Sequence, residues 1–141
     1  MSNELILAIS GNDIFSGGGL HADLATYTTN KQHGFVAVTC LTAMTEHGFE
    51  VIPVDPTTFA QQLNSLKDVP FSAIKLGLLP NVQVADLALD YVKAHAEIPV
   101  VLDPVLVCKE THDVEVSALR DELIKRSEEH TSELQSRITI S

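Results

Sequence analysis

The sequence is poor in basic residues, and this shortage narrows the range of partners. Nine Lys and Arg stand against nineteen Asp and Glu, which gives a formal net charge of −10. A surface of that sign repels phosphate backbones and anionic lipids, so we expect neither nucleic acid nor a membrane surface as a partner. No apolar run approaches the ~20 residues of a membrane span. The first residues lack the positive flank of a signal peptide, so we expect a cytoplasmic chain.

Cysteine is also scarce, which excludes two kinds of structural site. Cys40 and Cys108 lie far apart in the sequence, and there is no Cys-x-x-Cys spacing. This pattern excludes a local zinc knuckle and fits a reducing compartment. We expect neither cysteine to form a disulfide.

What remains is the composition of a single globular domain with an unusual end. The chain has 141 residues, of which 45% are hydrophobic. Globular patterning runs through Lys125, whereas the polar run 126–136 continues no apolar face. That run resembles, codon for codon, the translation of a common sequencing-library adapter, and Ile140 and Ser141 match the same frame. We therefore expect residues 1–125 to be the domain and 126–141 a non-native tail; a charged helix end is the alternative.

Short apolar runs alternate with helical patterns along the domain. A buried strand is expected where an apolar run is short and continuous, and a helix where apolar residues recur every three or four positions. Asp55 is expected to cap a helix that begins at Pro56, and Pro53 makes the run 51–54 an edge strand or an extended connection. Strands are predicted at 5–9, 35–41, 73–76 and 99–103, and helices at about 19–30, 56–66, 81–95 and 116–124.

This alternation predicts an α/β fold with a mainly parallel sheet and helices on both faces. Ligands of such sheets bind beyond the carboxyl ends of the strands. The loops expected there span residues 12–19, 43–47, 77–79 and 103–109, and polar and glycine residues concentrate in them. We expect the four loops to meet at one crevice.

Two of these loops carry residues suited to an anionic ligand. Gly17, Gly18 and Gly19 precede a helix, where bare amides and the helix dipole accept anions, although a plain tight turn explains them equally well. Asp13 and Asp23 flank this loop. Asp13 is explained equally well as a residue that caps a turn, and Asp23 as a charged residue near the N-terminus of a helix. Asp103 ends an apolar strand just before Pro104, a position suited to a metal-bound nucleotide.

Several motifs in register resemble one enzyme family. The stretch 8–24, AISGNDIFSGGGLHADL, is similar to the N-terminal motif of the pyridoxine kinase and hydroxymethylpyrimidine kinase group of the ribokinase-like superfamily. The likeness continues in TCLTAM (39–44), FAQQL (59–63), AIKLGLL (73–79) and VVLDPVLVCK (100–109). It covers residues 4–125 and implies a ribokinase-like three-layer domain, truncated after its N-terminal half. Such kinases transfer the γ-phosphoryl group of ATP, with Mg²⁺, to a hydroxymethyl group on a small heteroaromatic ring.

The resemblance also implies where the ligands lie. It places the ring pocket at Asp13, Gly17, Gly18, Gly19, His21, Met44, Gly77 and Cys108, with Asp103 and Lys109 nearer the phosphates and Mg²⁺. Lys109 is interpreted equally well as an exposed loop lysine. For Cys108, the alternative interpretation is an inert buried thiol. His33, His47, His95 and His112 show no metal-binding spacing, and we expect them at the surface.

Two positions favour the vitamin B6 branch of the family. Met44 replaces the Gln that reads the pyrimidine edge in the other branch, and a thioether cannot donate to that edge. Cys108 and Lys109 also resemble the pyridoxine branch, and a Cys beside a Lys can add reversibly to the pyridoxal aldehyde. The positions that depart from the family pattern are Ile14, Phe15, His21, Leu78, Leu79 and Glu110. The resemblance therefore indicates the class of reaction more directly than it indicates which ring is the substrate.

The family's catalytic residue does not occur within residues 1–125. The resemblance implies an Asp or Cys in a glycine-rich turn of the C-terminal half, so no catalytic residue is assigned here. Our first hypothesis is a B6 kinase present as an inactive fragment, with a pyrimidine kinase of thiamine biosynthesis as the alternative. A short vitamer-binding protein and a non-functional interaction fragment are the other hypotheses. Similar kinases are commonly dimers, so we expect a homodimer of the full-length protein.

Overall fold

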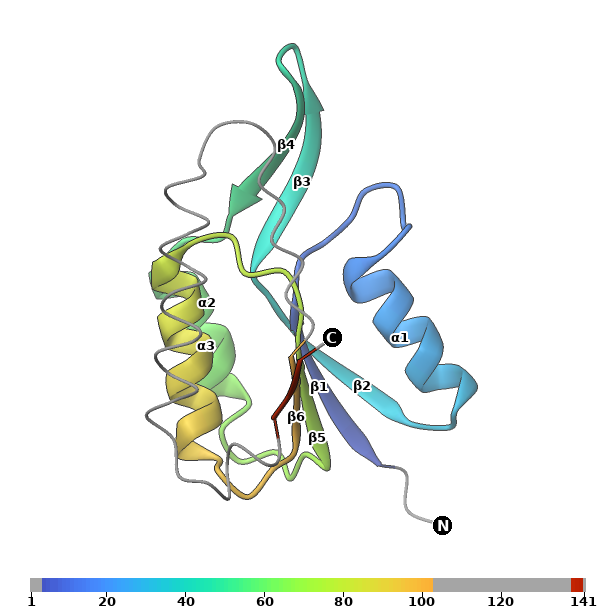
Figure 1. The fold of residues 1–141 in the computed structure, drawn as a ribbon, viewed down its shortest axis with the longest axis vertical. Helices are drawn as coiled ribbons and strands as arrows, with labels where there is room; N and C mark the ends of the chain where they lie inside the picture. The colour runs from blue at the N-terminus through green and yellow to red at the C-terminus, as the bar shows by residue number, and fades with distance from the viewer. Residues whose placement is uncertain (1–3, 103–137, 141) are drawn as a thin grey trace.

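The computed structural model describes residues 4–102 and 138–140, and its centre is a parallel sheet. The strands are β1 (Leu5–Ser10), β2 (His33–Val38), β5 (Ala73–Leu76), β6 (Val100–Leu102) and β7 (Ile138–Ile140). They lie in the order β2-β1-β5-β6-β7, and every neighbouring pair is parallel (Figure 1).

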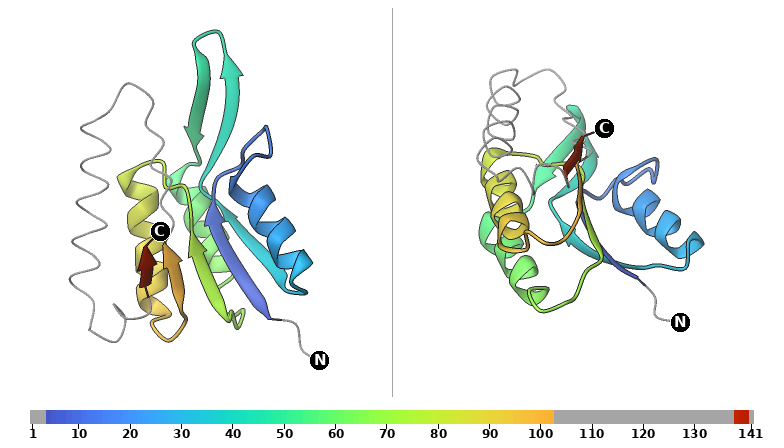
Figure 2. Two further views of the ribbon diagram at one scale, coloured as in Figure 1. Left: turned by 45° about the vertical axis from the view of Figure 1, so that its right-hand side comes forward. Right: turned by 60° about the horizontal axis from the view of Figure 1, so that its bottom comes forward.

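Helices cover both faces of this sheet. The helix α1 (Gly19–Thr29) lies on one face, against β1 and β2. The helices α2 (Pro56–Ser65) and α3 (Val82–Ala94) pack together on the other face (Figure 2). The expected α/β fold, with a mainly parallel sheet between two helical layers, is therefore confirmed.

Local sequence signals account for the starts of two helices. The carboxylate of Asp55 accepts hydrogen bonds from the amides of Thr57 and Thr58, and Pro56 occupies the first turn, as expected. Asn81 caps α3 in the same way through the amide of Val84. Such caps satisfy amide groups that have no partner within the helix.

The core lies between the sheet and the α2–α3 layer. Residues of β1, β5 and β6 alternate in the direction they face, and one set points at these two helices. Phe59 of α2 lies there and is the largest of the fully buried side chains. The other large core side chains that are fully or almost fully buried are Leu7, Ile9, Ile74, Leu76, Leu79, Val84, Val92 and Val100.

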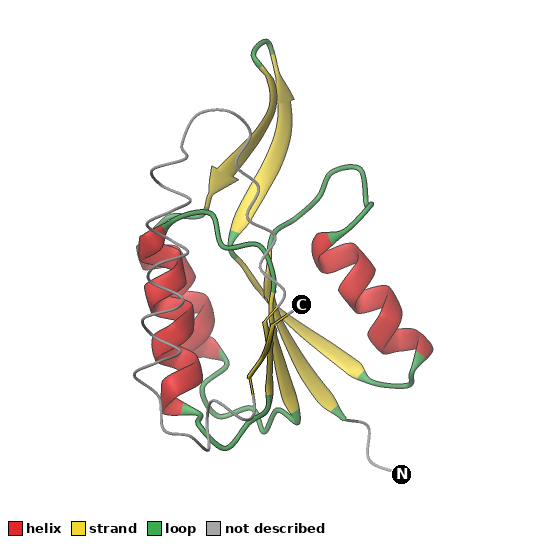
Figure 3. Ribbon diagram, viewed as in Figure 1, coloured by secondary structure: helices red, strands yellow, loops and turns green. Residues whose placement is uncertain are grey.

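One expected strand turns out to be two strands in different sheets. The run 35–41 divides at Thr39, where β2 ends and β3 (Cys40–Thr45) begins. β3 pairs antiparallel with β4 (Gly48–Pro53) in a separate two-stranded hairpin that projects beyond the carboxyl ends of the main sheet (Figure 3). Residues 43–47 are therefore not a loop after a parallel strand, because they form the end of β3 and the hairpin turn.

Side chains fix the point where the chain leaves the main sheet. The Gln62 carboxamide accepts a hydrogen bond from the Val38 amide at 2.8 Å and donates one to the Val38 carbonyl oxygen at 3.0 Å. The Thr39 hydroxyl donates to the Leu78 carbonyl oxygen at 2.6 Å, and its amide donates to the Ser10 carbonyl oxygen. The base of the hairpin is thereby tied to α2 and to the ends of β1 and β5.

Several predictions fall outside the described residues. These are the helix at 116–124, the loop 103–109 and most of the tail 126–141. Of that tail the structure describes β7 alone, which lies parallel to β6.

Candidate functional site

The loop after β1 is held in place by one carboxylate. Asp13 accepts hydrogen bonds from the Phe15 amide at 2.9 Å and from the Gly17 amide at 3.1 Å. Both oxygens are thus used within the loop, as expected of an aspartate that caps a turn. Asp13 therefore shapes the loop that leads into α1.

A left-handed backbone conformation at Gly19 brings the start of α1 close to the end of β1. Gly19 has φ of +61°, which disfavours any residue with a Cβ. A Cβ at this position would also overlap the Gly11 carbonyl oxygen, which accepts a hydrogen bond from the Leu20 amide. Gly18 is the N-cap of α1, and no side-chain hydrogen bond caps this end of the helix.

One face of the β3–β4 hairpin lies over this loop. Thr42 pairs with Val51, and Met44 pairs with Phe49. Residues opposite each other in an antiparallel pair, and residues two positions apart, share a face. Thr42, Met44, Phe49 and Val51 therefore form the inner face of the hairpin. The rings of Phe15 and Phe49 stack with centroids 6.2 Å apart, which joins the loop to the hairpin.

These elements enclose a pocket of about 380 Å³ at the carboxyl ends of β1 and β5. This volume lies within the usual range for small-molecule sites. The wall is drawn from the loop after β1, α1, the inner face of the hairpin and the end of β5. Its residues are Ser10, Gly11, Asn12, Asp13, Gly18, Gly19, Ala22, Asp23, Thr42, Phe49, Val51, Lys75, Gly77 and Leu78.

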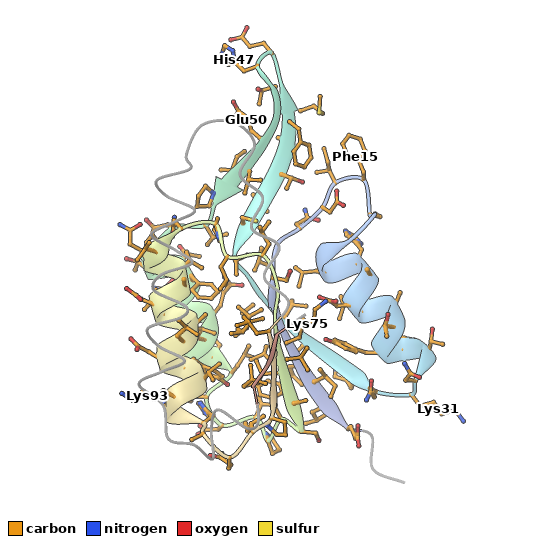
Figure 4. All side chains as sticks on the ribbon, in the orientation of Figure 1. Phe15, Lys31, His47, Glu50, Lys75 and Lys93 are labelled. Carbon is orange, nitrogen blue, oxygen red and sulfur yellow. The ribbon has the colours of Figure 1, made fainter. Side chains whose placement is uncertain are left out.

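An ion pair lies in the wall of the pocket, between α1 and the sheet. Lys75 of β5 extends towards α1, and its ammonium group contacts Asp23 Oδ1 (Figure 4). The Asp23 side chain is only 7% exposed, and the Lys75 side chain is 27% exposed. The second oxygen, Asp23 Oδ2, is buried and has no hydrogen-bond partner. Leaving such an acceptor unpaired costs about 1–3 kcal/mol.

The Asp23 charge also acts on Tyr27, one helical turn further along α1. Burial, together with this negative charge, raises the pKa of the Tyr27 phenol to about 12. Cys40 lies at the base of the hairpin and is fully buried. Burial raises the pKa of its thiol, against a smaller opposing effect of the Thr39 hydrogen bond. Neither group is set up to ionise near neutral pH.

Comparison with known families agrees with this architecture. The family model described as phosphomethylpyrimidine kinase matches residues 13–138, which is most of the chain. The chain belongs to the phosphomethylpyrimidine kinase family. The match includes α1, the hairpin and β5, whose carboxyl end forms part of the pocket.

Relatives in this family carry two kinds of name. The chain is 35% identical over 131 residues to pyridoxine kinase of Bacillus subtilis (strain 168), covering 87% of this chain and 48% of the relative. It is 33% identical over 130 residues to a hydroxymethylpyrimidine/phosphomethylpyrimidine kinase of Synechococcus elongatus, covering 88% of this chain and 49% of the relative. The chain thus spans about half the length of either relative.

Solved structures of both kinds share the fold. Pyridoxal kinase from Staphylococcus aureus in complex with AMP-PCP superposes with a TM-score of 0.78 at 29% identity, over 89% of this chain and 46% of that one. Phosphomethylpyrimidine kinase from Clostridium difficile 630 superposes with a TM-score of 0.73 at 25% identity, over 87% of this chain and 54% of that one. The ribokinase-like class expected from the sequence is confirmed by these neighbours.

The structure brings together only part of the predicted ring pocket. Asp13, Gly18, Gly19 and Gly77 line it, whereas Gly17, His21 and Met44 do not. His21 is exposed and pairs with the Asn12 carboxamide oxygen at 3.2 Å. Met44 is 59% exposed, further out on the inner face of the hairpin. Cys108, Asp103 and Lys109 lie outside the described residues, so their assigned roles stay predictions.

Lys75 is a charged pocket residue that the family resemblance does not assign to the site. It interrupts the apolar run Ala73–Leu76 as its one charged residue. A lysine inside a buried strand needs a partner, because unpaired buried charges are costly. That signal was available in the sequence. From the sequence alone, the pattern indicates an ordinary helix charge for the partner, Asp23.

No metal centre is present among residues 4–102 and 138–140. Within these ranges, no three His, Cys, Asp or Glu side chains gather closely enough to hold a metal ion. The same part of the chain contains no helix with the length and hydrophobicity needed to cross a bilayer.

Proposed function

We propose that the full-length protein is an ATP-dependent kinase that phosphorylates the hydroxymethyl group of pyridoxine, pyridoxal and pyridoxamine. The observation that carries this proposal is the pocket at the carboxyl ends of β1 and β5, in a chain of the phosphomethylpyrimidine kinase family. Its volume suits one heteroaromatic ring. Met44, on the inner face of the hairpin, favours the vitamin B6 ring over the aminopyrimidine.

A pyrimidine kinase of thiamine biosynthesis is the second candidate. Relatives named for each activity match at similar identity, 35% and 33%. The two activities differ in the ring that the pocket accepts, because both act on a hydroxymethyl group. The choice between them therefore depends on polar groups around the ring.

Phosphoryl transfer requires alignment and charge neutralisation more than covalent chemistry. The start of α1, at Gly18 and Gly19 in the pocket wall, suits an oxygen-rich group, because the helix dipole is positive there. Asp103 and Lys109 are the residues we assign to the neighbourhood of Mg²⁺ and the phosphates. When bound, Mg²⁺ neutralises charge on the transferred group. The catalytic base is assigned to the part of the protein that follows this half.

The 141-residue chain is proposed to be inactive by itself, since it spans about half the length of its relatives. Sequencing the source gene across the codon for Lys125 and beyond tests this directly. A reading frame that continues into a glycine-rich turn with an Asp or Cys supports the kinase and identifies the tail 126–141 as an artefact. A genomic tail followed by a stop codon contradicts both assignments.

The kinase assay uses the protein expressed from the full open reading frame. Pyridoxine, pyridoxal, pyridoxamine and hydroxymethylpyrimidine are each supplied with ATP and Mg²⁺, and kcat/KM is measured singly and in competition. A higher kcat/KM for the B6 vitamers supports the main proposal, and a higher value for the pyrimidine supports the alternative. Absence of phosphorylation of all four contradicts the proposed reaction.

Met44→Gln tests the basis for the choice of ring. Gln offers a donor and an acceptor to an aminopyrimidine edge, which a thioether does not. We expect the variant to shift the ratio of kcat/KM towards hydroxymethylpyrimidine by about tenfold, the value of one net hydrogen bond. Val36→Gln, at an exposed apolar position of β2 outside the hairpin, is the control. An unchanged ratio would remove Met44 from the argument.

A homodimer of the full-length protein is proposed on the outer face of the same hairpin. Leu41 and Ile52 are opposite each other in the hairpin register, and they are 49% and 44% exposed. Two adjacent exposed apolar side chains favour association. Analytical ultracentrifugation should find a dimer, and Leu41→Asp should shift it towards monomer. A monomeric wild-type protein contradicts this assignment.

A further inference from the structure

The polar side chains of the pocket divide into two groups by what they already bind. Ser10, Asn12, Asp13 and Thr42 all make hydrogen bonds within the protein. The Ser10 hydroxyl accepts from the Leu78 amide, and the Thr42 hydroxyl accepts from the Ile14 amide and donates to the Asn12 carbonyl oxygen. These bonds hold the loops that form the wall.

Asp23 and Lys75 form the other group. Their side chains meet through Asp23 Oδ1 alone, so Asp23 Oδ2 keeps its capacity to accept. An ammonium group has three N–H donors, and the contact with Asp23 Oδ1 uses only part of this capacity. The Lys75 side chain is more than a quarter exposed in the pocket wall. In the pocket wall, the pair therefore combines a buried acceptor that has no protein partner, from α1, with a partly exposed donor, from β5.

We propose that Asp23 and Lys75 together read two adjacent polar groups on the ring of the substrate. Asp23 Oδ2 accepts from a donor on the ring position next to the hydroxymethyl group that is phosphorylated, and Lys75 donates to an acceptor one position further. This inference rests on the proposed function and deepens it, because it names the chemical pattern that the pocket selects.

Both candidate ring classes carry this pattern in the same order. In pyridoxine and pyridoxamine, the donor is a hydroxyl or amino group on the neighbouring substituent, and the acceptor is the phenolic oxygen. In hydroxymethylpyrimidine, the donor is the amino group and the acceptor is a ring nitrogen. Pyridoxal differs, because its aldehyde carbon bears an acceptor where the others have a donor. One protein pair can therefore serve both rings and still separate pyridoxal from its relatives.

Asp23→Asn tests this inference, since it changes an acceptor into a donor with little change in shape. The Asn oxygen can keep the contact with Lys75 while its amide group occupies the place of Oδ2. Dissociation constants for the four ring compounds are measured by calorimetry on the protein expressed from the full open reading frame. We expect the variant to bind pyridoxine, pyridoxamine and hydroxymethylpyrimidine about tenfold or more weakly, because each loses a charged hydrogen bond. Pyridoxal should bind equally well or better.

Two further variants separate recognition from folding. Lys93→Met removes an exposed lysine from α3, on the opposite side of the sheet, and should leave all four constants unchanged. The neutral double variant Asp23→Asn with Lys75→Met avoids a buried unpaired charge. Because it has lost the Lys75 donor, we expect it to bind pyridoxal at least about tenfold more weakly than Asp23→Asn does.

The outcomes distinguish this inference from the proposed function. If the wild-type protein binds the rings but Asp23→Asn weakens all four by the same factor, or none, the pair is merely structural and the inference fails alone. If the wild-type protein binds none of the four, the proposed function fails as well. A selective loss that spares pyridoxal supports both.

Discussion

The rings of Phe15 and Phe49 stack 6.2 Å apart, with 26° between their planes, and join the loop after β1 to the hairpin. Phe15 belongs to the loop after β1 and is 66% exposed, whereas Phe49 belongs to β4 and lines the pocket. An aromatic pair of this kind contributes about 0.5–1.5 kcal/mol beyond burial. Together with the hydrogen bonds of Thr42 to Ile14 and Asn12, this stack sets the position of the hairpin relative to the glycine loop.

Phe15→Ala should weaken ligand binding more than it weakens the fold. The side chain is largely exposed, so we expect a loss of about 1 kcal/mol or less in the free energy of unfolding. Without the stacked ring, the hairpin loses a contact with the loop, and we expect a higher KM for the ring substrate with a smaller change in kcat. Phe15→Tyr, which keeps the ring, is the control. An unchanged KM in Phe15→Ala would show that the stack does not position the pocket wall.

Gly19→Ala should destabilise the fold and distort the pocket. A residue with a Cβ at φ of +61° costs about 1–3 kcal/mol in backbone strain, and its Cβ also overlaps the Gly11 carbonyl oxygen. The neighbouring Gly18 is extended, and a Cβ added there would meet no atom within 4 Å, so Gly18→Ala should leave stability almost unchanged. Urea denaturation of the two variants measures the difference. Equal stability of the two variants would contradict the tight approach of α1 to β1.

Tyr27 should titrate well above a normal tyrosine. Its pKa is about 12 instead of 10.0, first because of burial and second because of the Asp23 charge. Ultraviolet titration of tyrosinate in a Tyr91→Phe background follows Tyr27 alone, since the sequence has two tyrosines. Asp23→Asn should lower the Tyr27 pKa while leaving it above 10.0, because burial remains.

The same shift predicts how stability depends on pH. The unfolded chain releases the Tyr27 proton near pH 10.0, whereas the folded chain holds it until about pH 12. The contribution is fully present below pH 10.0, and the free energy of unfolding falls as pH rises between these values. Denaturation of Tyr27→Phe over this range provides the control, and its curve should fall less steeply. Parallel curves would contradict the burial of the phenol.

Cys40 should resist thiol reagents in the native state. It is fully buried, and burial raises the pKa of its thiol above the ordinary value of 9.0. Because the thiolate is the reactive form, both access and ionisation oppose the reaction. In a Cys108→Ser background, we expect no labelling at neutral pH until denaturant is added. Rapid labelling of the native protein would contradict the packing at the base of the hairpin.

Asp55→Ala should destabilise the protein by about 1 kcal/mol, the usual cost of losing an N-cap. The carboxylate accepts from the Thr57 and Thr58 amides at the start of α2. Asp55→Asn keeps an equivalent acceptor and should cost much less. Thermal denaturation of the pair provides the measurement, and a loss in Asp55→Asn as large as in Asp55→Ala would point to charge instead of capping.

Local patterns predicted those elements that depend on neighbours in the sequence. The strand at 5–9, the helix beginning at Pro56 and the strand at 73–76 are all present within a residue of their expected bounds. In each case the signal is short: an apolar run, a capping residue or a proline. Pro53 ends β4, an edge strand of the hairpin, as one of the two expected alternatives.

Contacts between distant residues explain what the sequence could not reveal. The run 35–41 looks continuous, yet it divides at Thr39 because that residue bonds to Ser10 and Leu78 in other parts of the chain. The hairpin was missed for the same reason, and with it the face shared by Met44 and Phe49. The pairing of Asp23 with Lys75 spans 52 positions, a separation that helical or strand periodicity does not encode.

The double hydrogen bond from Gln62 to Val38 has a consequence for the protein's behaviour at high concentration. β2 is an edge of the main sheet, and free amide and carbonyl groups on such an edge recruit strands from other molecules. The carboxamide occupies both backbone groups of Val38, as a neighbouring strand would. A single side chain thus blocks one end of that edge against β-sheet aggregation, at the place where the chain turns away to build the hairpin.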